Sequence, residues 1–325
     1  MSAPLSIGFV ALPDFTMLAL AGFLDTLRLA ADEGDRSRPI DCRWTVMTED
    51  GQPVRASNGV QVEPDCGLGD PSAFDYVVVA GGTLHRARNS DRLHAWLRRA
   101  SDAGVPLVGI CTGSFVLARA GLMDGRVSCV SWFHRAEFEH EFPDLAVSAD
   151  RLFVVDGDRI TCAGGTGVLH LASHLVDLHL GTGRSHKGLR VMIEDGDRGP
   201  FTPQPLPDLP GLDAIRDARL RQAVLLIERN LSVAPRMDAI AAEVGLSPRH
   251  LRRRFADEFG ATPVQLRERL RLAKARALLR TTDLSVTAIA HRTGFADAPH
   301  LARRCRREWG LTPRALRAGA EVSLR

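Results

Sequence analysis

The chain has 325 residues, of which 45% are hydrophobic, 25% charged and 6% aromatic. This composition is typical of an ordinary globular protein, and the length suffices for two domains. No stretch approaches the roughly 20 consecutive apolar residues of a membrane-spanning helix, so we expect no membrane partner. The apolar run from Phe15 to Leu24 has no Lys or Arg before it, unlike a signal peptide, and we expect the cytoplasm.

The net charge of +3 conceals an uneven distribution along the chain. Residues 218–325 hold 22 Lys and Arg against 10 Asp and Glu, whereas residues 1–217 hold 20 against 29. A basic C-terminal module behind an acidic body favours a polyanionic partner for the former. The alternative is that these arginines only form a solvated helical surface.

The six cysteines are dispersed and form no CxxC pair, which argues against a disulfide scaffold and against a zinc site. They are Cys42, Cys66, Cys111, Cys129, Cys162 and Cys305. His170 and His174 are four residues apart on a predicted helix, with Asp177 three further on, but further ligands are not evident. We therefore expect helix-surface histidines, no metal and no cofactor.

Up to about residue 195, short apolar runs alternate with helical patterns. Strands are predicted at 6–12, 43–48, 76–80, 107–110, 152–156 and 159–162, the last two as a hairpin through Gly157-Asp158, and helices at 18–31, 92–103, 114–120 and 168–180. This alternation indicates an α/β fold with a largely parallel sheet.

One motif in this region carries possible chemistry. Gly109-Ile-Cys111-Thr-Gly113 lies at a predicted strand-to-helix turn, where the flanking glycines let the central side chain stand exposed, as in a nucleophile elbow. Alternatively, Cys111 is only a small residue tolerated at a tight turn. Gly164-Gly-Thr-Gly167 resembles a phosphate loop but lacks a following Lys, and a turn entering the next helix explains it as well.

The boundary between the modules is a Pro-rich segment, Gly196 to Asp213, which cannot continue a helix and is expected to be extended. We predict a first domain at 1–195, a linker at 196–217 and a C-terminal domain at 218–325.

The C-terminal region carries one pattern twice. Ile240-Ala241, Gly245, Leu251, Phe255, Phe259-Gly260 and Thr262-Pro263 return as Ile289-Ala290, Gly294, Leu301, Cys305, Trp309-Gly310 and Thr312-Pro313. This spacing is typical of a helix-turn-helix, and two copies, at about 237–259 and 286–309, indicate a reader of double-stranded DNA. A helix at 263–280 should hold the two units rigidly.

The two copies differ in their outward side chains. In the first, Ser247 caps the recognition helix and Arg249, Arg252 and Arg253 face outward, where arginine reads guanine edges. A phosphate contact remains the alternative for any single Arg. The second exposes a less polar set that suits thymine methyl groups and phosphate clamping, namely Ala298, Pro299, Ala302, Arg303 and Arg304.

These residues resemble known families. Residues 1 to about 195 resemble PfpI-like, class I glutamine amidotransferase-like domains, through Val77-Val-Val-Ala-Gly-Gly82, the Cys111 elbow and Leu117-Ala-x-Ala-Gly121. Residues from about 219 to 318 resemble AraC/XylS regulators. The combination is similar to the GlxA-type AraC regulators, which implies a flavodoxin-like parallel-sheet sandwich followed by an all-α DNA-binding domain, acting as a transcriptional regulator and as a homodimer, with RNA polymerase as a partner if it is an activator.

The first domain departs from its enzyme relatives. The protease-like members place a His directly after the Cys, where this chain has Thr112, and an acid where it has Ala19. A nucleophile without a base or an acidic orienter lacks the activation that acyl transfer needs. We therefore expect a sensor and not an enzyme. The alternative is an amidase or PfpI-like hydrolase using Cys111, with His134 within reach as the base.

A ligand pocket over the elbow is expected, since ligands of open α/β sheets bind at the carboxyl ends of the strands. Its residues are predicted to be Cys111, Thr112, Gly113, Gly82, Phe15 and His134. The resemblance implies a small effector such as an amino acid, an amine or a related nitrogenous metabolite.

Overall fold

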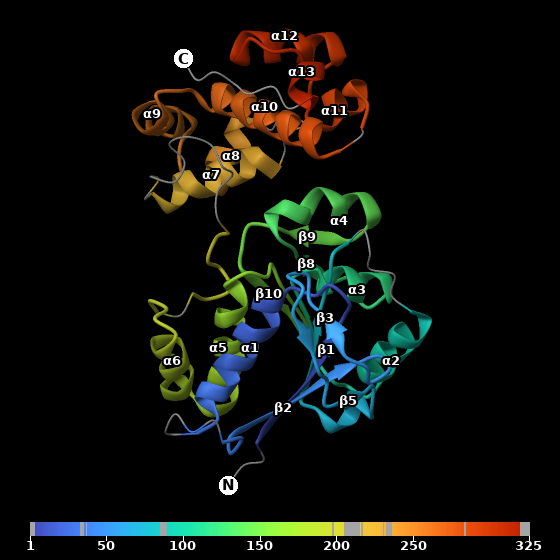
Figure 1. Ribbon diagram of the computed structural model, residues 1–325. Coiled ribbons are helices and arrows are strands. Elements are labelled where there is room, and N and C mark those ends of the chain that lie inside the picture. The colour runs from blue at the N-terminus through green and yellow to red at the C-terminus, as the bar shows by residue number, and fades with distance from the viewer. Residues whose placement is uncertain are drawn as a thin grey trace. The chain divides into compact units, whose positions relative to one another are not determined.

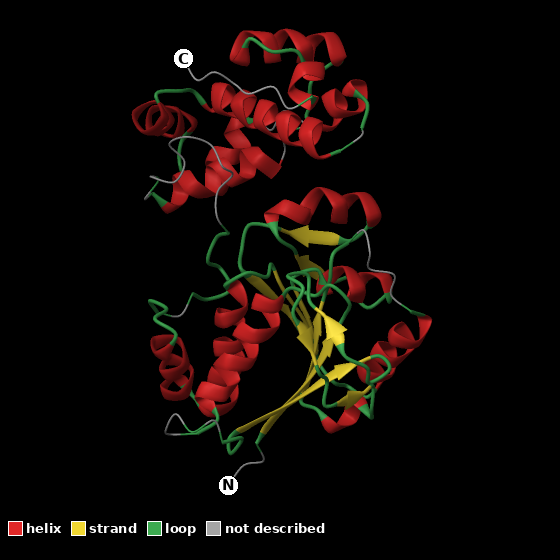
Figure 2. Ribbon diagram, viewed as in Figure 1, coloured by secondary structure: helices red, strands yellow, loops and turns green. Residues whose placement is uncertain are grey.

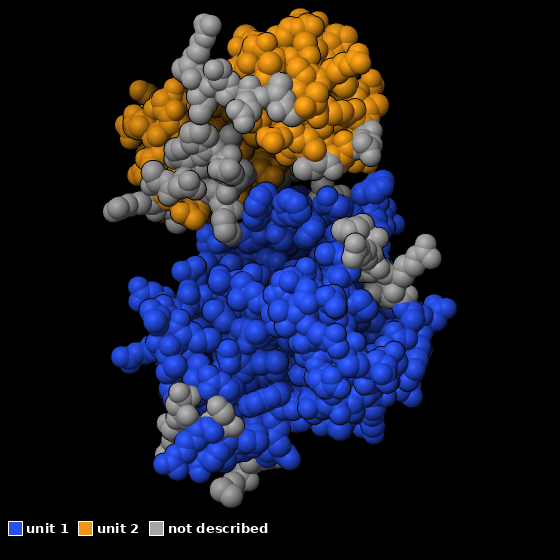
Figure 3. Space-filling view, viewed as in Figure 1, with its two compact units in different colours: residues 1–204 blue, residues 205–325 orange. Residues whose placement is uncertain are grey.

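The computed structural model describes residues 4–32, 36, 38–84, 90–196, 198–204, 215, 217–229, 231, 236–282 and 284–318. The chain forms two compact units, Met1–Gln204 and Pro205–Arg325 (Figure 3). Each unit is described by itself below.

The first unit is built on a seven-stranded sheet in the order β10-β11-β7-β6-β1-β2-β5 (Figures 1 and 2). The strands are β1 (Leu5–Ala11), β2 (Cys42–Thr48), β5 (Cys66–Gly67), β6 (Tyr76–Ala80), β7 (Leu107–Ile110), β10 (Phe153–Asp156) and β11 (Arg159–Cys162). Every neighbouring pair is parallel except β10 and β11, which form the predicted hairpin. The predicted α/β fold with a largely parallel sheet is confirmed.

Helices cover both faces of this sheet (Figure 1). One core forms with α1 (Met17–Ala30), α5 (Gly167–Leu180) and α6 (Thr182–Val191), and the other with α2 (Asp91–Asp102), α3 (Gly113–Arg119) and α4 (Arg135–Glu141). Val78 points into the first core and its neighbours Val77 and Val79 into the second, because successive strand side chains alternate. Such a strand is apolar throughout, which made β6 recognisable.

The remaining short elements were not predicted. They are β3 (Val54–Arg55) and β4 (Gln61–Val62), which pair with each other, β8 (Val127–Cys129) and β9 (Ala146–Ser148), which also pair, and two 3-10 turns at Pro71–Ala73 and Trp132–His134.

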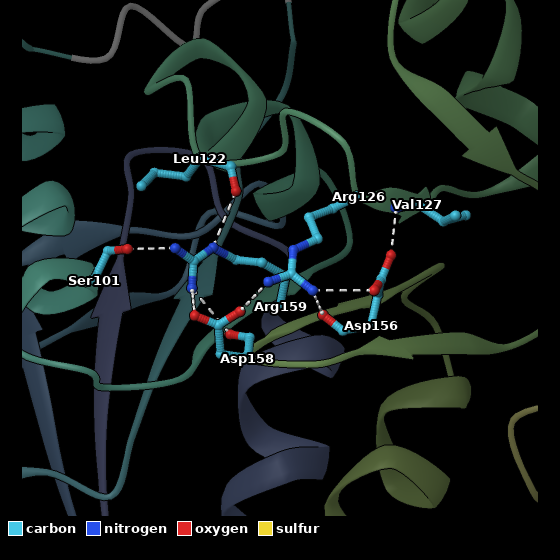
Figure 4. Close-up of polar contacts among 7 residues, drawn as sticks. All are labelled: Ser101, Leu122, Arg126, Val127, Asp156, Asp158 and Arg159. Atoms are coloured by element: carbon cyan, nitrogen blue, oxygen red, sulfur yellow. Dashed lines mark hydrogen bonds and ion pairs between the residues drawn. The ribbon is translucent and has the colours of Figure 1, made fainter.

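A polar cluster fixes the β10–β11 hairpin at the sheet edge opposite the Cys111 elbow (Figure 4). Arg159, 8% exposed, donates to the Leu122 carbonyl at 3.0 Å and also contacts Asp158. Arg126 bridges Asp156 and Asp158 at 3.2 and 2.9 Å. Because the buried guanidinium is paired and hydrogen-bonded, the cluster stabilises the hairpin.

The end of the first unit includes part of the predicted linker. The Leu152 amide donates to the Thr202 carbonyl at 3.0 Å, Pro203 forms a bridge with Arg151, and Gln204 is buried. Residues 202–204 of the predicted linker are thus hydrogen-bonded to the first unit. Within the predicted linker, residues 197, 205–214 and 216 lie outside the described residues.

The second unit contains helices and no strand among its described residues, as predicted. Its helices are α7 (Ala218–Arg229), α8 (Met237–Glu243), α9 (Pro248–Phe259), α10 (Pro263–Thr281), α11 (Val286–Arg292), α12 (Ala298–Trp309) and α13 (Pro313–Arg317). Helix α10 joins two cores: Leu266 and Leu270 pack into the first, whereas Leu272, Ala275 and Leu279 pack into the second. Each helix-turn-helix thus has its own core, and one helix connects them.

Candidate effector site and nucleic-acid interface

The Cys111 elbow has the strained geometry expected of such a turn. Strand β7 ends at Ile110, helix α3 begins at Gly113, and Cys111 between them has φ of +56°. A non-glycine residue in this left-handed region costs about 1–3 kcal/mol and persists only where its surroundings enforce it. Of the three non-glycine residues with positive φ among those described, two, Asp14 and Cys111, follow sheet strands at this edge.

Glycines allow the loops around Cys111 to approach one another closely. A Cβ on Gly113 would lie 2.1 Å from the Val79 carbonyl oxygen, and one on Gly82 would lie 2.1 Å from the Pro13 carbonyl oxygen. Neither distance is compatible with a side chain, so the loops after β1, β6 and β7 meet only because these positions are glycine. The structure thus brings together the predicted residues Gly82, Thr112 and Gly113 around Cys111.

The hydroxyl of Thr112 is occupied by a structural hydrogen bond. It donates to the Gly82 carbonyl at 2.6 Å, and the residue is buried. The thiol of half-buried Cys111 lies 3.3 Å from the Thr16 hydroxyl. Thr112 therefore joins two loops, and a threonine hydroxyl offers no base to the thiol at neutral pH.

The glycine run after β11 closes the other side of the elbow. A Cβ on Gly164, whose φ is +92°, would lie 3.0 Å from the Cys111 Cα and Cβ and 3.2 Å from its sulfur. Helix α5 then begins at Gly167. This run is a turn that enters a helix and walls the thiol.

Two predicted pocket residues lie in apolar surroundings. The Phe15 side chain is fully buried in the core against which Cys111 packs, so it supports the site from within and offers it no exposed surface. The His134 ring lies edge-on to Phe115 and Phe133, with centroids 6.3 and 5.0 Å away. Burial lowers the pKa of His134 below its ordinary value.

Among the described residues, no base is hydrogen-bonded to the Cys111 thiol. The hydrogen bonds of the described residues include none between His134 and Cys111. Ala19, at the position where the enzyme relatives carry an acid, is buried in the core. The elbow therefore has the shape of a nucleophile site, and within the described part of the chain its thiol has no bonded base.

The histidines of α5 are not the surface pair that the sequence suggested. His170 is completely buried; its Nδ1 accepts from the Arg198 amide at 3.2 Å and its Nε2 lies 3.2 Å from a Glu194 carboxylate oxygen. His174 stacks at a tilt on Phe153. No metal-binding group of three or more His, Cys, Asp or Glu occurs among the described residues.

The first recognition helix presents the arginines that the sequence predicted. Leu251 and Phe255 of α9 are buried, while Arg249, Arg252 and Arg253 are exposed. The Ser247 hydroxyl accepts from the His250 amide at 3.2 Å, which caps the helix and fixes where its first turn begins. Neighbouring Arg254 is instead paired with Asp217 and contacts His250.

The second recognition helix exposes only part of the set that was predicted to face DNA. Leu301 and Cys305 of α12 are buried, and Asp297 caps it by accepting from the His300 amide at 2.6 Å. Of the residues predicted to face DNA, Pro299 and Arg303 are exposed, and Ala298 and Ala302 are half-buried.

Arg304 was predicted to clamp phosphate, but its guanidinium pairs with Glu268 of α10, and its side chain is only 24% exposed. That prediction is corrected, because the ion pair connects α12 to α10. The two helices pack against each other, so the pair is partly shielded from water.

A junction between the two helix-turn-helix units was missed by the sequence reasoning. Arg271 of α10 donates to the Leu231 carbonyl at 2.6 Å. A Cβ on Gly294, in the turn of the second unit, would lie 2.3 Å from that same oxygen and 2.6 Å from an Arg271 nitrogen. The sequence did show a glycine at the turn of both units, but it could not show that Gly294 contacts Leu231 and Arg271, which are remote in sequence.

Comparisons with known proteins agree with both parts of the chain. The family model for a helix-turn-helix domain matches residues 240–319, and that of the DJ-1/PfpI family matches residues 29–178.

The HTH-type transcriptional regulator GbdR of Pseudomonas aeruginosa is 35% identical over 317 residues, which cover 97% of this chain and 85% of the relative. The HTH-type transcriptional regulator GlxA of Rhizobium meliloti is 30% identical, covering 96% and 95%. The chain belongs to the AraC-family transcriptional regulators with an N-terminal DJ-1/PfpI domain. This regulator therefore has the predicted architecture and class of function.

Solved structures support the fold of the first unit. An AraC family transcriptional regulator from Pseudomonas putida superposes with a TM-score of 0.52 at 23% identity, covering 58% of this chain and all of the other. A THiJ/PfpI family protein from Pseudomonas syringae gives a TM-score of 0.52 at 19% identity, covering 70% and 87%. Among the described residues, no helix is long and apolar enough to cross a membrane.

Proposed function

We propose that a small nitrogenous metabolite, such as an amino acid or an amine, binds at the Cys111 elbow and controls how the regulator binds promoter DNA. The observation that carries this proposal is the strained turn at Cys111, which is enclosed by loops that follow four adjacent parallel strands and has no base bonded to its thiol among the described residues. Strain of this kind is maintained at functional positions, and an elbow without an activating base suits binding better than turnover.

DNA recognition is assigned to α9 and α12. The exposed Arg249, Arg252 and Arg253 would read base edges from α9, and Pro299, Ala302 and Arg303 would contact thymine methyl groups and phosphates from α12. Two recognition helices on one chain suit successive major grooves, which lie roughly 34 Å apart on one face of the duplex. We propose a cytoplasmic homodimer, with RNA polymerase as a further partner if the regulator is an activator.

The effector site is tested by a thermal-shift screen of amino acids, amines and quaternary ammonium compounds on the full chain. Stabilisation grows with ligand concentration over the dissociation constant, so a hit raises the melting temperature. The shift is expected to vanish in Cys111→Trp, which fills the elbow, and to persist in Cys66→Trp, a matched change at an exposed cysteine. A hit that both variants retain would place the site elsewhere.

A hydrolase remains the second candidate, favoured by the positive φ of Cys111 alone. Incubation of the full chain with a panel of amide substrates tests it directly. We expect no turnover, because no described residue offers the thiol a hydrogen-bonded base. Turnover that disappears in Cys111→Ser would establish the enzyme instead.

A further inference from the structure

The last residues of the first unit are fastened by one buried side chain. The strap, defined here as Thr202–Gln204, ends in Gln204, which is only 2% exposed. The Gln204 Oε1 accepts from the Trp132 amide at 2.8 Å, and its Nε2 donates to the Val130 and Arg151 carbonyls, each at 2.8 Å. Its own amide donates to the Asp150 carbonyl at 3.2 Å.

Burial of the Gln204 side chain has a free-energy cost that its hydrogen bonds must offset. A glutamine side chain loses considerable rotamer entropy on burial, and its amide is stable there only when its hydrogen bonds are satisfied. Here both ends of the amide have backbone partners on the segments 129–132 and 150–152. The strap is therefore held by specific bonds, and the next residue begins the second unit.

The strap also has a short hydrogen-bonded route to the Cys111 elbow. Leu152 donates its amide to the Thr202 carbonyl at 3.0 Å, and its carbonyl accepts from the Ala163 amide at 2.9 Å. The residue after Ala163 is Gly164, which packs directly against Cys111. Leu152 thus connects the wall of the elbow with the strap through its own peptide groups.

We propose that the strap is a ligand-operated latch. Occupation of the Cys111 elbow displaces Gly164 and Ala163, weakens the two hydrogen bonds of Leu152 and releases Gln204 from its buried position. Release adds residues 202–204 to the connection between the first unit and the DNA-binding unit. A longer connection changes the effective concentration at which the DNA-binding units of a dimer bind two neighbouring DNA sites. The inference rests on the proposed function, since it takes the elbow as the effector site.

A ligand can open the latch only if it binds more tightly to the state with Gln204 released than to the state with Gln204 buried. Gly164 provides this difference in affinity, because it lies so close to Cys111 that a Cβ on Gly164 would be 3.0 Å from the Cys111 Cα. Any group placed on the sulfur must compete with this backbone for space. The loop then has to move if the group stays.

The test uses the full chain with Cys66→Ser, which removes the exposed cysteine among those described, and N-ethylmaleimide on Cys111 as the probe. Hydrogen exchange is followed at the amides of Leu152 and Gln204. Alkylation is expected to speed both by about tenfold, while amides of the central strand β1 stay protected. Gly164→Ala, which adds a Cβ against Cys111, is expected to do the same without a reagent.

Gln204→Ala separates a latch from a simple structural contact. In this variant the two amides exchange rapidly before alkylation, and alkylation adds nothing further. Gln61→Ala, a matched change at an exposed glutamine of β4, should behave as the parent chain. If neither alkylation nor Gly164→Ala changes exchange at Leu152 and Gln204, the latch does not exist. This result is independent of the metabolite screen, so failure of the latch and failure of the proposed effector are distinguished.

Discussion

The guanidinium of Arg304 pairs with the carboxylate of Glu268, so the second recognition helix is tied to the helix that joins both DNA-reading units. Both side chains are about a quarter exposed. Burial lowers the pKa of Arg304, as expected for a cation held away from water. An arginine that sequence reasoning places on DNA thus positions α12 instead.

Removing the partner of Arg304 should destabilise the second unit. In Glu268→Gln the partly buried cation keeps its position without a counter-charge, which we expect to cost about 1–2 kcal/mol after allowing for solvent screening. Urea unfolding of the full chain measures the change. Glu243→Gln, at an exposed glutamate of α8, serves as the control and should leave the midpoint unchanged. Equal midpoints for the two variants would show that the pair contributes nothing.

Substitution of Gly294, the glycine at the junction, should destabilise the protein more than substitution of Gly310, a glycine at a helix end with a similar φ. Gly294 and Gly310 have φ of +77° and +68°, but only a Cβ on Gly294 would collide, with the Leu231 carbonyl oxygen and Arg271. Gly310→Ala should cost about 1 kcal/mol from backbone strain alone, and Gly294→Ala at least about 2 kcal/mol more. Thermal unfolding compares them. Similar losses would mean that the junction can relax around a methyl group.

Base reading by α9 predicts a loss that depends on DNA sequence. Arg253→Ala should weaken binding to the promoter fragment by about 1–3 kcal/mol and binding to scrambled DNA much less, because only the former loses a base contact. Fluorescence anisotropy at fixed salt measures both. Arg280→Ala, an exposed arginine at the end of α10, is the control. Equal weakening on both DNAs would make Arg253 a phosphate contact.

The partly buried imidazole of His134 predicts a pH dependence of stability. Its folded pKa lies below the ordinary 6.5, since burial among aromatic rings disfavours the charged form. The unfolded chain therefore binds the proton first, and stability is lost as the pH falls below about 6.5. His134→Gln should remove this part of the loss between pH 7 and 5, whereas His186→Gln, at an exposed histidine, should not. Parallel pH profiles for the parent and His134→Gln would contradict the assignment.

Local patterns in the sequence predicted the elements that carry the site. Glycines two residues either side of Cys111 indicated the elbow, and apolar residues at helical spacing placed α9 and α12 to within a residue. The partners of Arg304, Arg271, Gln204 and His170 were not predictable, because each lies far away in sequence or on another element. A composition rich in Pro likewise predicted an extended linker, but it gave no sign that two backbone hydrogen bonds and one buried amide hold residues 202–204 against the first unit.

Control of DNA binding from the Cys111 elbow is tested most directly on the promoter next to the gene. Footprinting with the full chain is repeated with and without the metabolite that gives the largest thermal shift, for the parent, Cys111→Trp and Cys66→Trp. The account predicts a ligand-dependent change of the footprint in the parent and in Cys66→Trp, and none in Cys111→Trp. A footprint that responds equally in all three would contradict it.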